Sequence, residues 1–276
     1  LIPTVFTRET ASALSALAVK KNVNKTIHVK VDTGMGRLGI FPHTAALSFL
    51  QYLKTLPNLS IQGLYTHYAT ADESDKSYTL EQLKKFKDIV QILKENNLCP
   101  PLLHTANSAA AIEMKESWYN MVRLGISMYG HYPSEEVDKS IISLKPMITL
   151  KSRISYLKEV PAGTAISYGS TYVTKSRTKV ASIPLGYGDG YNRLLSNQAD
   201  VLIRGKRCPL IGRVCMDQFL ADVTAVDSVN TGDEVVLYGQ QDNEIISVEE
   251  IANKLQTINY EVLCAVGKRV PRVYKS

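Results

Sequence analysis

Several short segments of this chain combine residues that can do chemistry, and they stand where strands are expected to end. Residues 30–37 read KVDTGMGR, and the pairs Asn107-Ser108 and Gly125-Ile126 offer hydroxyl and amide donors for a phosphate. Arg123 adds a permanent cation. Tyr168 lies between a serine and a glycine, and its phenol can carry a proton. The combination predicts an enzyme site that holds a phosphorylated group and transfers a proton.

Each of these residues also has an ordinary structural interpretation. Arg123 can form a surface salt bridge, and Asn107-Ser108 can simply cap a helix. Tyr168 can be one of the packed tyrosines of a chain that has 15 of them. Lys30 lies on the same strand face as Asp32 by the period of two, so the pair can form an ion pair. The residues alone leave these alternatives open.

Composition narrows the class of protein. The chain has 276 residues, of which 45% are hydrophobic and 21% charged, proportions typical of one large or two smaller globular domains. We find no apolar run of membrane-spanning length and no signal-peptide pattern, so we expect a soluble, cytoplasmic protein without a membrane partner. The four cysteines lack metal-binding spacing, and the net charge of +6 is scattered, so we expect neither a metal nor nucleic acid.

The first half alternates short β-rich runs with helical periodicity. This alternation predicts βα units and a parallel sheet or barrel. Four such units make half of an eight-stranded barrel, so we expect either an open sheet or further units ahead of Leu1. The predicted strands are 26–31, 61–67, 102–106 and 121–124, and the predicted helices are 42–56, 80–97 and 108–115.

The second half changes to short alternating runs separated by turn residues, a pattern typical of antiparallel sheet. One helix is expected at 248–255, with Ser247 as its N-cap and Glu250 three residues later. We therefore predict two domains, a partial α/β barrel at 1–140 that binds a cofactor and a β domain at 141–276 that contributes the tyrosine. The predicted strands of the second half are 149–160, 179–183, 199–203, 218–223 and 234–238.

These motifs, in this order, resemble the bacterial alanine racemase family along the entire chain. The resemblance implies an α/β fold: the C-terminal part of a TIM-type eight-stranded barrel followed by an antiparallel β domain. It also implies pyridoxal 5'-phosphate as cofactor. The family's V-K-A-D-A-Y-G-H-G segment, which carries the Schiff-base lysine, has no counterpart here, so we expect residues ahead of Leu1. The matching segments are KVDTGMGRLG (from Lys30), THYATAD (Thr66), HTANSAA (His104), VRLGIS (Val122), SYGSTY (Ser167), PLGYGDG (Pro184), GRVCMDQ (Gly212) and RVPR (Arg269).

The resemblance also assigns roles to individual residues. Tyr168 is implied as the base on one face of the substrate, reaching in from the partner subunit of a homodimer, and Lys30 as a candidate carbamate. The implied catalytic residues are Tyr168, Arg37, His67 and Arg123. Those implied to bind the cofactor are His104, Asn107, Ser108, Arg123, Gly125, Ile126 and Tyr260. Those implied to contact the substrate are Arg37, Met216, Asp217 and Tyr187.

The reaction implied is the interconversion of L-alanine and D-alanine, which supplies D-alanine for peptidoglycan. Two alternatives stay open from the sequence. A related racemase of serine or of several amino acids would share the motifs, because one added hydroxyl in a small pocket is discriminated weakly. A fragment that binds pyridoxal phosphate but is catalytically incompetent would also show them, because the Schiff-base lysine is absent.

Overall fold

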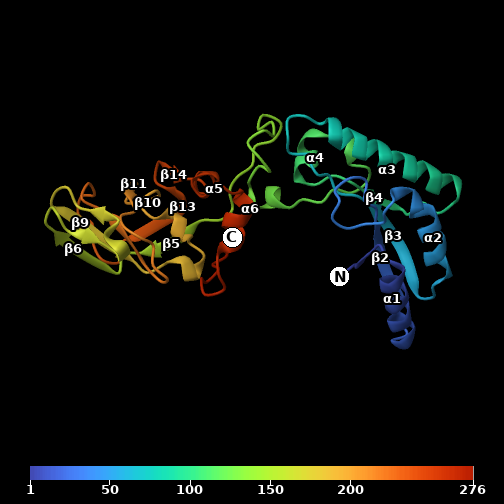
Figure 1. The fold of residues 1–276 in the computed structure, drawn as a ribbon, viewed down its shortest axis with the longest axis horizontal. Helices are drawn as coiled ribbons and strands as arrows, with labels where there is room; N and C mark the ends of the chain where they lie inside the picture. Colours follow the sequence, from blue (N-terminus) through green and yellow to red (C-terminus); the bar gives the residue numbers. More distant parts are fainter. Residues whose placement is uncertain (276) are drawn as a thin grey trace. The chain divides into compact units, whose positions relative to one another are not determined.

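The computed structural model describes residues 1–275, which form two compact units. The first unit is Leu1–Lys145, and the second begins at Pro146. Figure 1 shows helices and parallel strands in the first unit and mainly short strands in the second.

The first unit is a four-stranded parallel sheet with helices between its strands. The strand order follows the sequence order, β1-β2-β3-β4, as in one segment of an α/β barrel. The strands are β1 (Thr4–Val5), β2 (Lys25–Lys30), β3 (Leu59–Tyr65) and β4 (Leu102–His104); the helices are α1 (Arg8–Lys20), α2 (Ala46–Thr55), α3 (Ser77–Glu95) and α4 (Ser108–Glu113); and the 3-10 turns are η1 (His43–Ala45), η2 (Lys115–Ser117) and η3 (Ile126–Tyr129).

The core of this unit follows from the helical and strand periodicities. In α3, Leu83, Phe86, Val90 and Leu93 recur at helical spacing, and all four are buried. They pack in one hydrophobic cluster with apolar residues of α2 and of the strands, except that Leu83 joins a smaller cluster next to α4. This packing holds the helices against the sheet and so fixes the positions of the strand ends that carry the candidate site residues.

The predicted strand at 121–124 is wrong. The chain there is irregular, and its backbone meets the segment around β4 only at isolated points, Asn120 N to Leu103 O (3.4 Å) and Arg123 N to Ala106 O (3.0 Å). β4 pairs with β3 and, in the described part of the chain, forms no ladder with residues 121–124. The sequence reading also missed the first βα unit, β1 and α1.

The second unit consists of antiparallel sheets. The larger sheet has the order β11-β10-β13-β14 with β5 paired to β13, and the smaller sheets are β12-β9-β6 and β7-β8. The strands are β5 (Leu150–Arg153), β6 (Tyr156–Val160), β7 (Ala165–Ile166), β8 (Tyr172–Val173), β9 (Thr178–Ile183), β10 (Asp200–Ile203), β11 (Lys206–Pro209), β12 (Phe219–Asp222), β13 (Glu234–Gln241) and β14 (Glu244–Ile246); the 3-10 turns are η4 (Tyr168–Ser170), η5 (Tyr187–Asp189) and η6 (Arg193–Leu195); the helices are α5 (Val248–Leu255) and α6 (Asn259–Ala265).

The predicted helix at 248–255 is confirmed at both ends. The Glu250 N–H donates to Ser247 Oγ at 3.0 Å, which satisfies one of the open donors of the first helical turn. Its buried residues Val248, Ile251 and Ala252 join the core of the β domain. None of the helices in residues 1–275 is long and apolar enough to cross a membrane.

Candidate active site

The guanidinium of Arg123 is the centre of the polar cluster in the first unit. Its two terminal nitrogens donate to five acceptors on two neighbouring segments, the ones at the ends of β3 and β4. Within the described residues, the Nε–H has no hydrogen-bond partner, so this donor can serve a bound molecule. The contacts are Nη1 to His104 Nδ1 (2.9 Å) and His104 O (3.1 Å), and Nη2 to Thr66 O (2.8 Å), Thr105 O (3.0 Å) and His67 Nδ1 (3.2 Å).

Arg123 also fixes the state of the two imidazoles that it contacts. A guanidinium can only donate, so Nδ1 of His67 and Nδ1 of His104 must each be unprotonated. Burial, together with the nearby positive charge of Arg123, lowers the pKa of His67 to about 4 and that of His104 to about 3. Both rings are therefore neutral near pH 7, with their protons on Nε2.

Lys30 and Arg37 bring further positive charge to the same unit. Lys30 is buried, and its pKa is lowered first by burial and then by the charge of Arg37. Asp32 opposes this shift but, across the described chain, forms no ion pair with Lys30. The Oδ1 of Asp32 instead accepts the backbone N–H groups of Gly34 (2.9 Å) and Gly36 (3.1 Å) and so shapes the turn that leads to Arg37. The simple lysine–aspartate pair is thus not formed.

Ser108, the first residue of α4, lies where donors converge. Its side chain is 4% exposed, and its Oγ accepts from Gly125 N (2.8 Å) and from Ser127 Oγ (3.1 Å). A Cβ at position 125 would stand 3.7 Å from that same oxygen, an ordinary van der Waals contact. The Ser108 hydroxyl and the Gly125 amide therefore lie in direct contact, and both are groups of the kind that bind a phosphate.

The neighbouring residues have more local roles. The Oδ1 of Asn107 accepts from Ala110 N (3.1 Å), so its side chain caps α4, the ordinary interpretation of this residue. Ile126 begins η3 directly after Gly125, whose amide donates to Ser108. Ser108, Gly125 and Ile126 lie close together as the motif implied, and the Asn107 side chain serves the helix.

Tyr168 in the second unit is held outward by an unusual turn. Its side chain is 71% exposed, which rules out the packed core tyrosine. The preceding Ser167 has φ 61° and ψ −174°, a backbone region that is costly for any residue except glycine. The hydroxyl of Ser167 donates to Arg213 O (2.8 Å) and helps to hold this conformation. Strain of this kind, kept by surrounding contacts, is typical of functional positions.

Tyr187 and Met216 lie on two loops that are joined through their backbones. Tyr187 N donates to Cys215 O (3.1 Å), and Gly188 N donates to Met216 O (2.8 Å). The side chains of Tyr187 and Met216 are exposed, as is the neighbouring Asp217. The structure thus brings these three residues together within the β domain. Tyr260, a fourth residue of this unit, lies on α6 and is 37% exposed.

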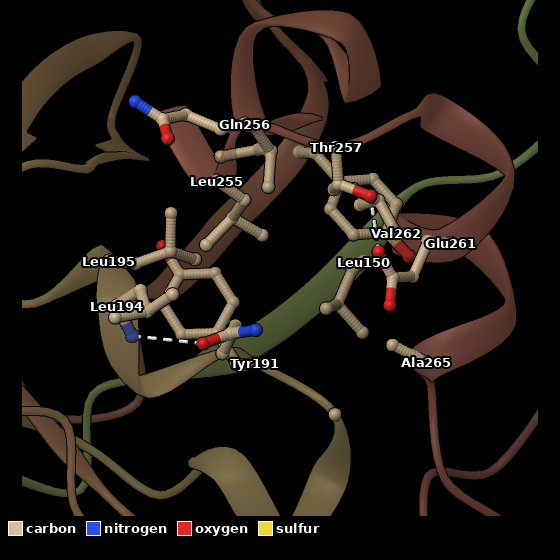
Figure 2. A pocket seen from close by; sticks show the side chains of 14 residues that line it. Leu150, Tyr191, Leu194, Leu195, Leu255, Gln256, Thr257, Glu261, Val262 and Ala265 are labelled. Carbon is tan, nitrogen blue, oxygen red and sulfur yellow. Dashed lines mark hydrogen bonds between the residues drawn. The ribbon is translucent and has the colours of Figure 1, made fainter. Parts of the chain in front are cut away.

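A cavity of about 330 Å³ in the β domain lies apart from these residues. Figure 2 shows its wall, built by side chains of the loop before β10 and of α5 and α6, with Tyr191, Leu195, Leu255 and Val262 around it. None of the site residues expected from the sequence lines this cavity. Its size alone therefore does not mark it as the place of the chemistry.

Two aromatic residues of the first unit were missed by sequence reasoning. Tyr65 stacks on His104 with ring centroids 4.7 Å apart, and the Arg123 guanidinium lies 5.0 Å from the centre of the Tyr65 ring. His28 contacts the other side of His104. The period of two could have identified both residues. His28 is two residues before Lys30 on one strand, and Tyr65 is two residues before His67 at the end of the adjacent strand, so each shares a face with a predicted site residue.

Comparison with known proteins gives one consistent result. Residues 1–133 match the family model for the alanine racemase N-terminal domain, and residues 147–274 match the model for the alanine racemase C-terminal domain. The chain is 52% identical over 276 residues to the alanine racemase of Halothermothrix orenii, covering 100% of this chain and 72% of that protein. It is 47% identical over 271 residues to the alanine racemase of Methanococcus maripaludis, covering 98% and 72%.

Solved structures agree with the sequence comparison. Alanine racemase of Clostridium difficile superposes with a TM-score of 0.93 at 38% identity, covering 100% of this chain and 71% of that one. Alanine racemase of Bacillus anthracis with bound L-Ala-P gives a TM-score of 0.91 at 39% identity, covering 99% and 70%. The likeness spans both units of the chain.

Proposed function

The chain belongs to the alanine racemase family of pyridoxal-phosphate-dependent isomerases, and we propose that it interconverts L-alanine and D-alanine by using Tyr168 as one proton carrier. Its fold is part of the family's α/β barrel followed by the antiparallel β domain. The observation that carries the proposal is the Arg123 guanidinium, whose terminal nitrogens are all engaged while its Nε–H is left for a ligand.

The residues of the first unit fit the cofactor. Pyridoxal phosphate, when bound, supplies a ring that withdraws negative charge from the substrate's α-carbon. Ser108 and the amides of Gly125 and Ile126 would hold its phosphate, and Arg123 Nε–H would face its ring nitrogen. Tyr260 and His104 complete the proposed set, His104 by orienting the guanidinium.

An arginine at the ring nitrogen selects the type of reaction. A guanidinium has a pKa above about 12 and can only donate, so it keeps that nitrogen unprotonated. Charge then remains largely on the α-carbon, which favours return of a proton to the carbon that lost it. This outcome suits a racemase, whereas transamination requires the proton to be placed elsewhere.

Proton transfer is assigned to Tyr168, with His67 as its supporting residue. Racemisation needs a proton carrier on each face of the α-carbon, and an exposed phenol on a strained turn provides one of them. Because Arg123 donates to His67 Nδ1, the His67 proton is on Nε2 and can be donated to a phenolate oxygen. Positive charge from Arg37 adds to this stabilisation.

Substrate binding is assigned to residues that surround this proton path. Arg37, at the end of the Asp32 turn, would attract the substrate carboxylate, and the backbone N–H of Met216 would donate a hydrogen bond to it. Tyr187 and Asp217, exposed on the neighbouring loops, would form the entrance.

Lys30 is proposed to carry a carbamate. Its lowered pKa increases the fraction of Lys30 that is a neutral amine. The nitrogen of this amine can form a bond to the carbon of CO2 with release of one proton. The product is an anion, and it would offset the positive charge of Arg37 and Arg123, both of which lower the pKa of the buried Lys30. This modification would also hold Arg37 in position.

A homodimer with shared sites completes the proposal. Next to the proposed phosphate site, the side chains of Val122, Leu124, Met128 and Tyr129 are 37 to 61% exposed, an apolar surface that suits a second copy of the chain. D-alanine supply for peptidoglycan in the cytoplasm is the role that such an enzyme would have.

Tyr168→Phe tests the function, with Tyr172→Phe as the matched control on the neighbouring strand. We expect Tyr168→Phe to lose racemisation of alanine by at least about 100-fold while the cofactor stays bound, and Tyr172→Phe to keep it. Mixing Tyr168→Phe with Arg123→Gln protomers should restore part of the activity, since one hybrid site regains both residues. Unchanged turnover in Tyr168→Phe, or faster turnover of serine than of alanine, would contradict the proposal.

A further inference from the structure

Behind the Arg123–His104 contact lies a second buried histidine. His28 Nδ1 is 2.9 Å from His104 Nε2, and the two residues are only 8% and 2% exposed. The chain of contacts runs from the guanidinium through one imidazole to the next, all within the first unit. His28 is not among the residues proposed to bind the phosphate or to carry a proton, so the proposed function leaves it without a role.

The protons on the Arg123–His104–His28 contacts can be placed by elimination. Arg123 must donate to His104 Nδ1, so the single proton of the neutral His104 ring is on Nε2. That Nε2–H can only donate to His28 Nδ1, which must therefore be unprotonated as well. Burial lowers the pKa of His28, so its ring too is neutral at pH 7. Its own proton is then on Nε2, a buried atom that has no hydrogen-bond partner within the described residues, so the His28 ring bears this cost in order to accept from His104.

We propose that His28 is a positioning residue: by accepting the Nε2–H of His104, it holds His104 in the tautomer that leaves Nδ1 facing Arg123. A buried N–H without an acceptor is unfavourable, so an absent acceptor at position 28 would make this tautomer costly. His104 would then partly shift its proton to Nδ1, where it would collide with an Arg123 N–H.

The His28 ring fits against the sheet because a glycine, Gly63, lies opposite it on the adjacent strand. His28 on β2 pairs with Gly63 on β3 just after an irregularity in the strand register. A Cβ at position 63 would stand 2.7 Å from three atoms of the imidazole, a separation that real contacts do not show. The absence of a side chain at Gly63 therefore lets the ring lie flat over β3 and reach His104.

His104 is held from its other side too. Tyr65 stacks on it with an angle of 11° between ring planes, whereas the His28 ring is tilted by 49°. The stack restrains the plane of His104, and the His28 contact determines which nitrogen carries the proton. Together they orient Nδ1, and through it the guanidinium whose Nε–H is proposed to meet the cofactor.

The inference rests on the proposed function for its catalytic consequence, but the tautomer itself can be measured directly. We would label histidine with 15N and compare the wild type with His28→Asn, whose amide oxygen can accept near the position of Nδ1, and with His28→Leu, which has no acceptor. His104→Gln assigns the His104 signals among the five histidines of the chain.

In the wild type and in His28→Asn, we expect His104 to show an unprotonated Nδ1 and a protonated Nε2. In His28→Leu, a population with protonated Nδ1 should appear. Alanine racemisation should fall by about 10- to 100-fold, the loss typical when a metal-ligating histidine loses the hydrogen-bond acceptor of its other ring nitrogen. His28→Asn should recover most of this loss.

A wild-type His104 with its proton on Nδ1 would overturn the inference, as would a His28→Leu variant with the wild-type tautomer and rate. If His28→Leu does not fold, the wild-type and His28→Asn spectra still decide the point. A protein that shows the expected tautomer but does not racemise alanine would contradict the proposed function and leave the role of His28 intact.

Discussion

Replacing Gly63 by alanine is expected to destabilise the first unit through a single collision. The new Cβ would stand 2.7 Å from Cγ, Nδ1 and Cε1 of His28. The imidazole cannot easily move away, because it is buried and bonded to His104. No positive φ is found at Gly63, so the backbone itself tolerates alanine and the effect is steric.

The size of the effect follows from the cost of overpacking. Adding a methyl group to a packed interior typically costs about 1 to 3 kcal/mol. Each kcal/mol corresponds to a shift in melting temperature of roughly 2 to 4 °C for a chain of 150 to 250 residues. We therefore expect Gly63→Ala to lower the first unit's transition in differential scanning calorimetry by several degrees.

A double-mutant cycle makes the explanation specific. In a His28→Ala background the added methyl group meets no ring, so Gly63→Ala should cost little. Gly267→Ala is the control, because its Cβ would stand an ordinary 3.4 Å from the nearest atom, Asp189 O. An equal penalty for Gly63→Ala with and without His28, or no penalty in either background, would refute the reasoning.

Two further outcomes follow from charge and protonation. Because the folded-state pKa values of His67 (about 4) and His104 (about 3) lie below the ordinary value of 6.5, the folded chain binds fewer protons than the unfolded chain. The stability from these neutral rings is complete above pH 6.5 and is lost as the pH falls towards 4. Urea titrations should therefore show a free energy of unfolding that declines from pH 6.5 to 5, and His104→Gln should reduce this decline. A free energy of unfolding that does not change over this range would contradict the presence of neutral buried rings. With 13C-bicarbonate, a carbamate signal should appear in the wild type and in Lys21→Arg but be absent from Lys30→Arg, and its absence from the wild type would leave Lys30 a free amine.

Most of the helices and strands that could be predicted were predicted from local sequence patterns, such as capping residues and apolar spacing. The α5 helix was bounded correctly by its N-cap and its buried face. The apolar spacing predicted α3, but at 80–97 rather than Ser77–Glu95. The strand expected at 121–124 did not form: its composition suits a strand, but the chain there has only isolated backbone hydrogen bonds to the segment around β4. The two-residue strands β7 and β8 are defined only by their pairing with each other, which composition does not encode.

The site residues came from motifs, but their relations required the fold. The contact of Arg123 with His67 joins residues 56 positions apart, and the contact of His28 with His104 joins residues 76 apart. No periodicity along the chain reports such a distance. The choice between a lysine paired with Asp32 and an unpaired lysine likewise depended on where the turn donors of Gly34 and Gly36 lie.

The central claim is that Arg123 presents its remaining N–H to the ring nitrogen of pyridoxal phosphate. Nitrogen NMR of the protein loaded with cofactor labelled by 15N in the ring tests it directly, because protonation moves the resonance of that nitrogen far upfield. We predict an unprotonated ring nitrogen across the pH range in which alanine is racemised. A protonated ring nitrogen at the pH of full activity would contradict the account.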